Sequence, residues 1–281
     1  MPDFSSAIWN KPAAAAAAAD DPVTKSLRFN ADDTPSLYRT FSAGNSTKWT
    51  LSFWYKRSVD GDTDYIFNTG AGGWQGYSGG TNNGSNLSIG VIYIWSDKLK
   101  FYNYDSGTGS SDVKTLALVL RDAASFYHIV MSYDGGQSTR LKVYINGEIQ
   151  TLDSGAVSAT SFFNTAQVHS IGFYGGNTSS LSARWPYMHG FLSDMYWLDG
   201  TGNADFSSYT NPAHAFAEED STTGQWKPKA ASGLTYGTNG FHLEMKETGT
   251  GTASSSTIGA DTSGEDNHFT THNLAASDVV N

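Results

Sequence analysis

The chain has 281 residues, no cysteine and a formal net charge of −10 at pH 7. This charge argues against a nucleic-acid groove, in which Lys and Arg neutralise phosphates, and against insertion into or adhesion to an anionic membrane. The absence of cysteine excludes disulfides and thiolate-bound metal. Stability must therefore come from burial and strand pairing, which fits assembly in a reducing cytoplasm.

Residues 1–25 are predicted to form an N-terminal arm. Its large apolar residues are Phe4, Ile8 and Trp9, and a run of seven alanines follows. That run is too short for a stable isolated helix, an export signal or a membrane span. Two interpretations stay open: a disordered leader, or an arm that orders against another subunit with these three residues as anchors.

Period-two alternation predicts strands from residue 26 onward. Apolar and polar residues alternate between regular Gly, Asn and Asp turns, and no segment has a convincing helical period. We predict an all-β fold: a two-sheet antiparallel jelly-roll sandwich over residues 26–204. Strands are expected at residues 26–29, 36–41, 49–57, 64–68, 87–95, 98–104, 114–121, 127–133, 141–145, 149–152, 168–174 and 190–198.

The clearest pattern is the meander at residues 126–152. The odd positions from 127 to 133 are Tyr, Ile, Met and Tyr and share one face, and the residues between them share the other. Asn146-Gly147 between alternating strands predicts a tight hairpin turn, because both residues tolerate positive φ. In the hairpin at 87–104, the polar side of the second strand carries Lys98, Lys100, Tyr102 and Tyr104.

Residues 205–281 are predicted to form an irregular C-terminal extension with one or two strands and a flexible tail. A short helical turn is expected at 211–216 and a strand at 241–245. The segment 249–264 is almost entirely Gly, Thr, Ser and Ala, which predicts a flexible linker. The sequence leaves open whether Asn281 is the natural C-terminus.

Several motifs carry a family resemblance. YHIVMSYDGG (127–136) and LKVYINGE (141–148) resemble the paired core strands of laminin-G-like, concanavalin-A-like jelly-roll domains. With SLRFN, WTLSFWYKR and GFLSDMYWLDG, and later WKPK, YGTNGFHL and DTSG, the chain resembles laminin-G-like virion structural proteins of tailed, especially marine, phages. The resemblance covers about residues 26 to 281.

The resemblance implies a non-enzymatic virion structural protein, assembled in the host cytoplasm and displayed on the virion surface. It implies host-surface attachment as a tail fibre or appendage, or decoration of the capsid, and leaves these alternatives open. The expected partners are other virion subunits, reached through the arm. A homo-oligomer is expected, with a trimer favoured because fibres are usually trimeric.

Catalytic motifs are missing from the sequence. Laminarinase-type enzymes of this architecture carry a Glu-x-Asp-x-Glu run on one strand, and the chain has none. Gly76-Tyr77-Ser78-Gly79-Gly80 matches the G-x-S-x-G pattern, but it lies in a glycine-rich loop with no helix after it. We predict no catalytic residue. A polysaccharide depolymerase and a soluble carbohydrate-binding module outside any particle remain the alternatives.

Sugar binding is the ligand chemistry that the sequence favours. Aromatic rings stack on the apolar faces of sugars, while amide and guanidinium groups bind the hydroxyls. The residue types fit two loops, 70–86 and 175–187. The predicted carbohydrate contacts are Trp74, Tyr77, Asn82, Asn83, Arg184, Trp185 and Tyr187.

No cofactor is predicted, with Ca²⁺ as the one alternative. Asp134 lies in the YDGG turn, and laminin-G-like domains often bind Ca²⁺ through loop Asp residues at the edge of the sandwich. Ca²⁺ needs six to eight oxygen ligands, so a turn Asp that accepts backbone hydrogen bonds is the competing interpretation. His268 and His272 are four residues apart, but no helix is predicted there to align them for metal.

Overall fold

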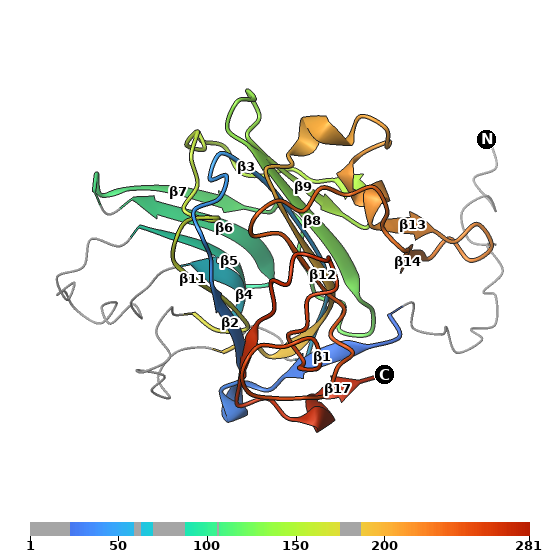
Figure 1. Cartoon of the computed structure of the whole chain (residues 1–281). Coiled ribbons are helices and arrows are strands. Elements are labelled where there is room, and N and C mark those ends of the chain that lie inside the picture. The colour runs from blue at the N-terminus through green and yellow to red at the C-terminus, as the bar shows by residue number, and fades with distance from the viewer. Residues whose placement is uncertain (1–22, 59–62, 70–87, 106, 175–186) are drawn as a thin grey trace, which may run out of the picture.

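The computed structural model describes most of the chain outside the N-terminal segment and three loops (Figure 1). The predicted anchors Phe4, Ile8 and Trp9 lie outside the described residues. Of the predicted arm only residues 23–25 are described, and Val23 is buried against Trp54 and Ala217. The described residues are 23–58, 63–69, 88–105, 107–174 and 187–281.

Two antiparallel sheets pack face to face, which confirms the predicted all-β jelly-roll sandwich (Figure 1). The larger sheet has eight strands. In spatial order they are β10 (Glu148–Ile149), β9 (Leu141–Ile145), β8 (Tyr127–Asp134), β3 (Lys48–Arg57), β12 (Gly190–Asp199), β1 (Ser26–Phe29) and β17 (Val279–Val280), with β15 (Phe241–Leu243) also paired to β12.

The smaller sheet has seven strands. In spatial order they are β16 (Thr270–His272), β2 (Ser36–Thr40), β11 (Val168–Ile171), β4 (Asp64–Thr69), β5 (Ile89–Trp95), β6 (Lys98–Asp105) and β7 (Ser110–Thr115). A separate hairpin pairs β13 (Ala217–Glu219) with β14 (Trp226–Pro228), and short 3-10 turns cover Ala31–Asp33, Asn203–Phe206, Pro212–Ala215 and Ala276–Asp278. None of the helices in the described ranges is long and apolar enough to cross a membrane.

The core lies between the inward faces of the two sheets. The odd-numbered positions of β3 and of β8 point inward, as the alternation predicts. Aromatic rings fill the centre: the Trp49 and Trp197 rings stack with centroids 4.9 Å apart, and Phe67 lies 5.2 Å from Trp197. Such rings contribute large buried areas and favourable ring–ring contacts. These contacts join the two sheets.

The predicted turns form as their residues require. Asn146 has φ 48° and Gly147 has φ 83°, which confirms the hairpin between β9 and β10. In the YDGG turn, a Cβ on Gly135 would lie 1.9 Å from the carbonyl oxygen of Ala159. Only glycine allows the backbone to approach that closely.

The strand predicted at 114–121 was placed wrongly. The strand is β7, which ends at Thr115 and pairs only with β6. Its residues 110–112 are polar because an edge strand exposes much of its surface, so they were mistaken for a loop. The apolar residues after it are buried without forming a strand: Leu116 makes an isolated bridge to Leu152, and the Leu120 N–H bonds the Asp97 carbonyl.

The C-terminal extension is more ordered than predicted. It contributes β15 and β17 to one sheet and β16 to the other, and Phe241, Leu243, Ile258 and Phe269 belong to the main core. The segment 249–264, predicted as a flexible linker, is folded. Its small residues serve close packing: a Cβ on Gly259 would lie 2.5 Å from the carbonyl oxygen of Phe269.

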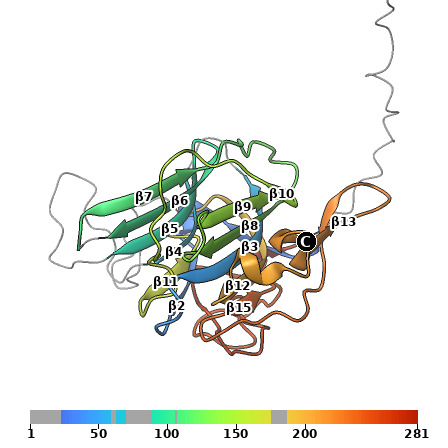
Figure 2. The same cartoon turned by 90° about the horizontal axis from the view of Figure 1, so that it is seen from above.

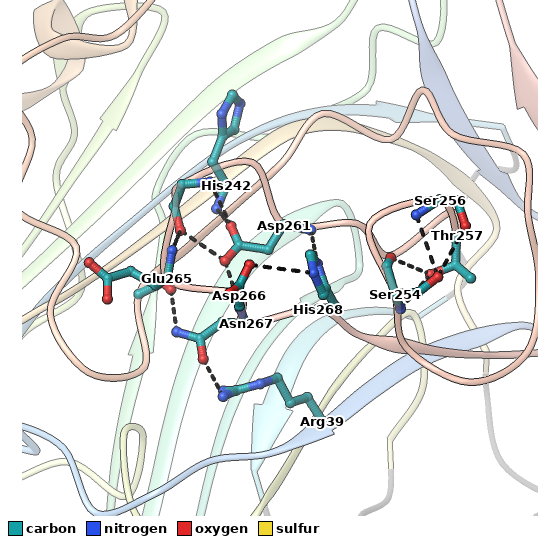
Figure 3. Close-up of polar contacts among 12 residues, drawn as sticks. Arg39, His242, Ser254, Ser256, Thr257, Asp261, Glu265, Asp266, Asn267 and His268 are labelled. Carbon is teal, nitrogen blue, oxygen red and sulfur yellow. Dashed lines mark hydrogen bonds and ion pairs between the residues drawn. The ribbon is translucent and has the colours of Figure 1, made fainter.

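Asp261 organises this part of the extension (Figure 3). Its carboxylate accepts the backbone N–H groups of His242 at 2.8 Å and Asn267 at 2.8 Å, and its own N–H donates to Nδ1 of His268 at 2.9 Å. The Asn267 side chain in turn accepts a hydrogen bond from Arg39 of β2. The DTSG motif therefore links the extension to both sheets.

Residues 203–228, hereafter the cover segment, bury the outer face of the eight-stranded sheet (Figure 2). Phe206, Ala213, Ala215 and Phe216 pack on outward-facing residues of β8, β9 and β12. The predicted helical turn at 211–216 is confirmed as the 3-10 turn Pro212–Ala215, capped by the Asn211 side chain. Much of the outer face of the central strands β3, β8, β9 and β12 is thus covered within one chain.

Candidate functional site

The outer face of the seven-stranded sheet carries a group of aromatic residues that are only half-buried. The residues come from β4, β5, β6 and the segment after β11, and they alternate with core residues such as Phe67, Ile92 and Phe101. Period-two alternation places Tyr93, Tyr102 and Tyr104 on the outer side, and a bulge between Tyr65 and Phe67 in β4 brings Tyr65 to the same side. We call this group the tyrosine face: Tyr65, Tyr93, Tyr102, Tyr104 and Tyr174.

Strand pairing brings these rings together. Tyr65 and Tyr93 are cross-strand partners, and their rings stack with centroids 5.7 Å apart. The Tyr174 ring stacks on the Tyr65 ring with centroids 4.7 Å apart, and the Tyr102 and Tyr104 rings are parallel, with centroids 6.3 Å apart and an interplanar angle of 4°. The result is a set of parallel ring faces fixed to a rigid sheet.

The phenol groups of Tyr65, Tyr93 and Tyr174 stay protonated at neutral pH. Burial, together with the neighbouring Tyr93, raises the pKa of Tyr65 to about 12. Burial also raises the pKa of Tyr93 and of Tyr174, with nearby tyrosines adding to the effect. A protonated phenol is both a donor and an acceptor. The Tyr65 ring is stacked against the rings of Tyr93 and Tyr174, so the tyrosines of β5 and β6 are the candidate ligand contacts.

Most of the predicted carbohydrate contacts lie outside the described residues. Tyr187 is the exception: it is 3% exposed, and its ring stacks on Phe173 with centroids 4.7 Å apart. Its ring is therefore covered by the protein and is not accessible to a ligand. The predicted contacts outside the described residues are Trp74, Tyr77, Asn82, Asn83, Arg184 and Trp185.

Asp134 has the surroundings of a structural turn residue. Its Oδ1 accepts the N–H of Gly136 at 3.1 Å, and its Oδ2 lies 3.9 Å from Nζ of Lys48, which also pairs with Asp205 at 3.0 Å. An amino group thus occupies the position beside this carboxylate. Among the described residues, no three His, Cys, Asp or Glu side chains cluster as metal ligands would. The Ca²⁺ prediction stays a prediction.

A second candidate site is a groove of about 620 Å³ between β12, β15 and residues 228–231. Asp194, His242 and Glu244 line it. Nε2 of His242 bonds Oδ1 of Asp194 at 2.6 Å, and the His242 ring stacks on Tyr196 at 3.8 Å. Asp194 has φ 48° at a bulge of β12, which turns its side chain toward the groove.

Sequence reasoning looked for ligand contacts in the loops and missed the tyrosine face. The usable pattern was present in the strands: Tyr93 alternates with core residues in β5, and Tyr102 and Tyr104 do so in β6. Aromatic residues on the solvent-facing side of two neighbouring strands form one aromatic surface when the strand register places them side by side. The register came only with the structure.

Comparisons with known proteins identify the family of this chain. A family model described as the Concanavalin A-like lectin/glucanases superfamily (Laminin_G_3) matches residues 32–205. Among solved structures, a Bacteroides ovatus protein described as a candidate carbohydrate-binding protein has 13% identity and a TM-score of 0.54, over 89% of this chain and 58% of its own. A search of curated proteins finds no match.

Two further solved structures are similar in part. A heptameric pentraxin from Limulus polyphemus has 18% identity and a TM-score of 0.45, over 66% of this chain and 81% of its own. Tailspike protein 2 of an Escherichia coli O157:H7 bacteriophage has 16% identity and a TM-score of 0.40, over 63% of this chain and 23% of its own. Since the family model matches more than half of the residues, the chain belongs to the laminin-G-like group of the concanavalin A-like lectin/glucanase superfamily.

Proposed function

We propose that this chain is a non-enzymatic surface protein of a tailed-phage virion that binds host-surface glycans through the tyrosine face. The observation that carries the binding proposal is the group of half-buried tyrosines Tyr93, Tyr102 and Tyr104 on the outer face of β5 and β6. The virion role is supported by the motif resemblance described above. Fibre or appendage and capsid decoration remain two versions of this role.

Physical chemistry supports a glycan at such a face. The C–H side of a pyranose ring packs on an aromatic ring, and the sugar hydroxyls need donors and acceptors around it. The tyrosines supply both from the rigid strands β5 and β6. A preformed platform loses little entropy on binding, which favours affinity.

Binding to an array of bacterial surface polysaccharides, followed by calorimetric titration of the ligands found, tests this function. Tyr93→Ala and Tyr102→Ala are each expected to weaken affinity about tenfold or more, since truncating a central aromatic contact costs about 2 kcal/mol. Tyr93→Phe, which keeps the ring, is the matched control and should retain most of the affinity. Equal affinity of Tyr93→Ala and the wild type would remove the tyrosine face from the proposal.

The proposal also includes the assembly predicted from the resemblance: a homo-oligomer, with a trimer favoured, attached to other virion subunits through Phe4, Ile8 and Trp9. Mass spectrometry of purified particles tests the location. Deleting residues 1–22 is expected to leave the sandwich folded and to remove the protein from particles. A truncated chain that still co-purifies with particles would exclude the arm as anchor.

One observation favours a second candidate function, a polysaccharide depolymerase. Asp194 of β12 and Glu244, the residue after β15, both line the groove between these two strands. Retaining glycosidases need two carboxyl groups about 5–5.5 Å apart. Against it, Asp194 bonds His242 and Glu244 pairs with Lys246. Oligosaccharide release from host polysaccharide that Glu244→Gln abolishes would support this function.

A further inference from the structure

The hairpin of β5 and β6 ends in a group of basic and aromatic side chains beside the tyrosine face. Trp95 is 51% exposed, one of few large apolar side chains with such exposure among the described residues. Lys98 is its cross-strand partner, and Lys100 is the partner of Tyr93. Period two places all three side chains on the outer side with the tyrosines. We call Trp95, Lys98 and Lys100 the lysine end of the face.

Lys98 and Lys100 have no ion-pair partner within 4 Å among the described residues. Asp97, in the turn between the strands, is already bound by Arg57 at 2.6 Å and by Arg121 at 2.9 Å. On a chain of net charge −10, this end of the sheet is locally positive.

The ammonium group of Lys100 is partly desolvated. Its Nζ lies 4.1 Å from the centroid of the Trp95 ring. Burial lowers the pKa of Lys100, while the charge of Asp153 acts in the opposite direction. The Asp153 carboxylate itself accepts the N–H of Thr115 at 3.1 Å. The Trp95 ring and the Asp153 charge offset part of the lost hydration, and the net lowering of the pKa means that an anionic ligand would stabilise the cation further.

We propose that the lysine end selects acidic glycans, with a carboxylate or sulfate group of the ligand bound by Lys98 and Lys100. The adjacent sugar ring then packs on Tyr93 or Trp95. This inference rests on the proposed glycan-binding function and adds the ligand class to it. Lys114 and Arg140 differ from this pair, because they bond the backbone carbonyls of Asp153 and Gly135 at 3.1 Å each.

The test compares polymers that differ only in charge. Affinities of the full chain are measured for polygalacturonate against its carboxyl-reduced neutral form, and for dextran sulfate against dextran. We expect at least one acidic polymer to bind about tenfold or more tightly than its neutral counterpart, and the binding constant to fall with salt. The polymer pair that shows the difference tells carboxylate from sulfate.

Variants assign the preference to its residues. The double variant Lys98→Gln, Lys100→Gln is expected to remove the preference and leave binding of the neutral polymer unchanged. Lys142→Gln, on the other sheet, removes a charge of the same kind and should change nothing. Trp95→Ala should weaken acidic and neutral polymers alike, which distinguishes a sugar contact from simple ion exchange.

Two results would overturn the acidic preference: equal affinity within both polymer pairs, or a loss in Lys142→Gln as large as in the double variant. The proposed function survives these results if Tyr93→Ala still weakens the binding that is seen by about tenfold or more. If no polymer of the array or of the two pairs binds the full chain, both the preference and the glycan-binding function fail.

Discussion

The outer faces of the two sheets both carry aromatic or apolar residues at alternating positions, but one face is covered by the chain and the other is partly exposed. On the eight-stranded sheet, outward residues such as Trp54 and Val130 are 1% and 0% exposed, because the cover segment packs on them. On the seven-stranded sheet, Tyr93 and Tyr102 occupy equivalent positions and are half-buried. An outward aromatic residue can thus pack in the protein interior or remain accessible to a ligand. On the eight-stranded sheet the cover segment packs on these residues and makes them part of the interior.

The largest expected effect comes from weakening the cover. Phe216 is fully buried beside Tyr196, with ring centroids 5.0 Å apart. Phe216→Ala should lower the free energy of unfolding by about 3–5 kcal/mol, because a cavity replaces a buried ring. Tyr93→Ala on the open sheet should cost only about 1 kcal/mol, the value of a stacked pair. Urea unfolding monitored by fluorescence measures both, and equal losses would contradict the comparison.

The pH dependence of stability depends on histidines buried in the sandwich and under the cover. His128 accepts the indole N–H of Trp226 at Nδ1 and bonds Ser52 at Nε2, so it is neutral. Burial lowers the pKa of His128 and of His169 to about 3. The unfolded chain gains a proton at each below about pH 6.5. Acid therefore favours unfolding.

Asp64 acts in the opposite sense, since burial raises its pKa to about 6 and the folded chain keeps a proton that the unfolded chain releases above about pH 4. Between about pH 4 and 6 the unfolded chain therefore binds two more protons at the histidines and one fewer at Asp64, a net difference of about one proton. The free energy of unfolding should fall by about 1.4 kcal/mol per pH unit from about pH 6 to 4. His128→Asn should flatten this slope and Tyr93→Phe should keep it; a flat wild-type profile would refute the assignment.

The smallest expected effect compares two valines. Val130 is fully buried under the cover, whereas Val113 on β7 is 42% exposed. Val130→Thr buries a hydroxyl in apolar surroundings and should cost about 1–3 kcal/mol. Val113→Thr should cost less than about 0.5 kcal/mol, because water solvates the hydroxyl. Thermal denaturation of the two variants gives the contrast, and a similar drop in both would mean that β7 is also covered.

The sequence was sufficient to predict the two-sheet sandwich, but not which of its outer residues are covered by other parts of the chain. Alternation in residues 127–133 identified which side chains share a face, and Asn146-Gly147 identified a turn, because both depend on local geometry. Whether His128 faces water depends on Trp226, which is distant along the chain. Glycines 249 and 259 were interpreted as flexibility, although they serve close backbone contact. The tyrosine face was missed because register is a long-range property.

The first described strand of the chain pairs with the last: Ser26 lies opposite Val280, and Leu27 joins Leu192 on its other side. These partners are more than 160 and about 250 residues apart in the sequence. Pairing between such distant segments is slow, because the entropy of closing a long loop is lost before the stabilising contacts form. Pairing of β1 with β12 and β17 should therefore be a late step in folding of the larger sheet, after the local hairpins of β8 to β10 have formed.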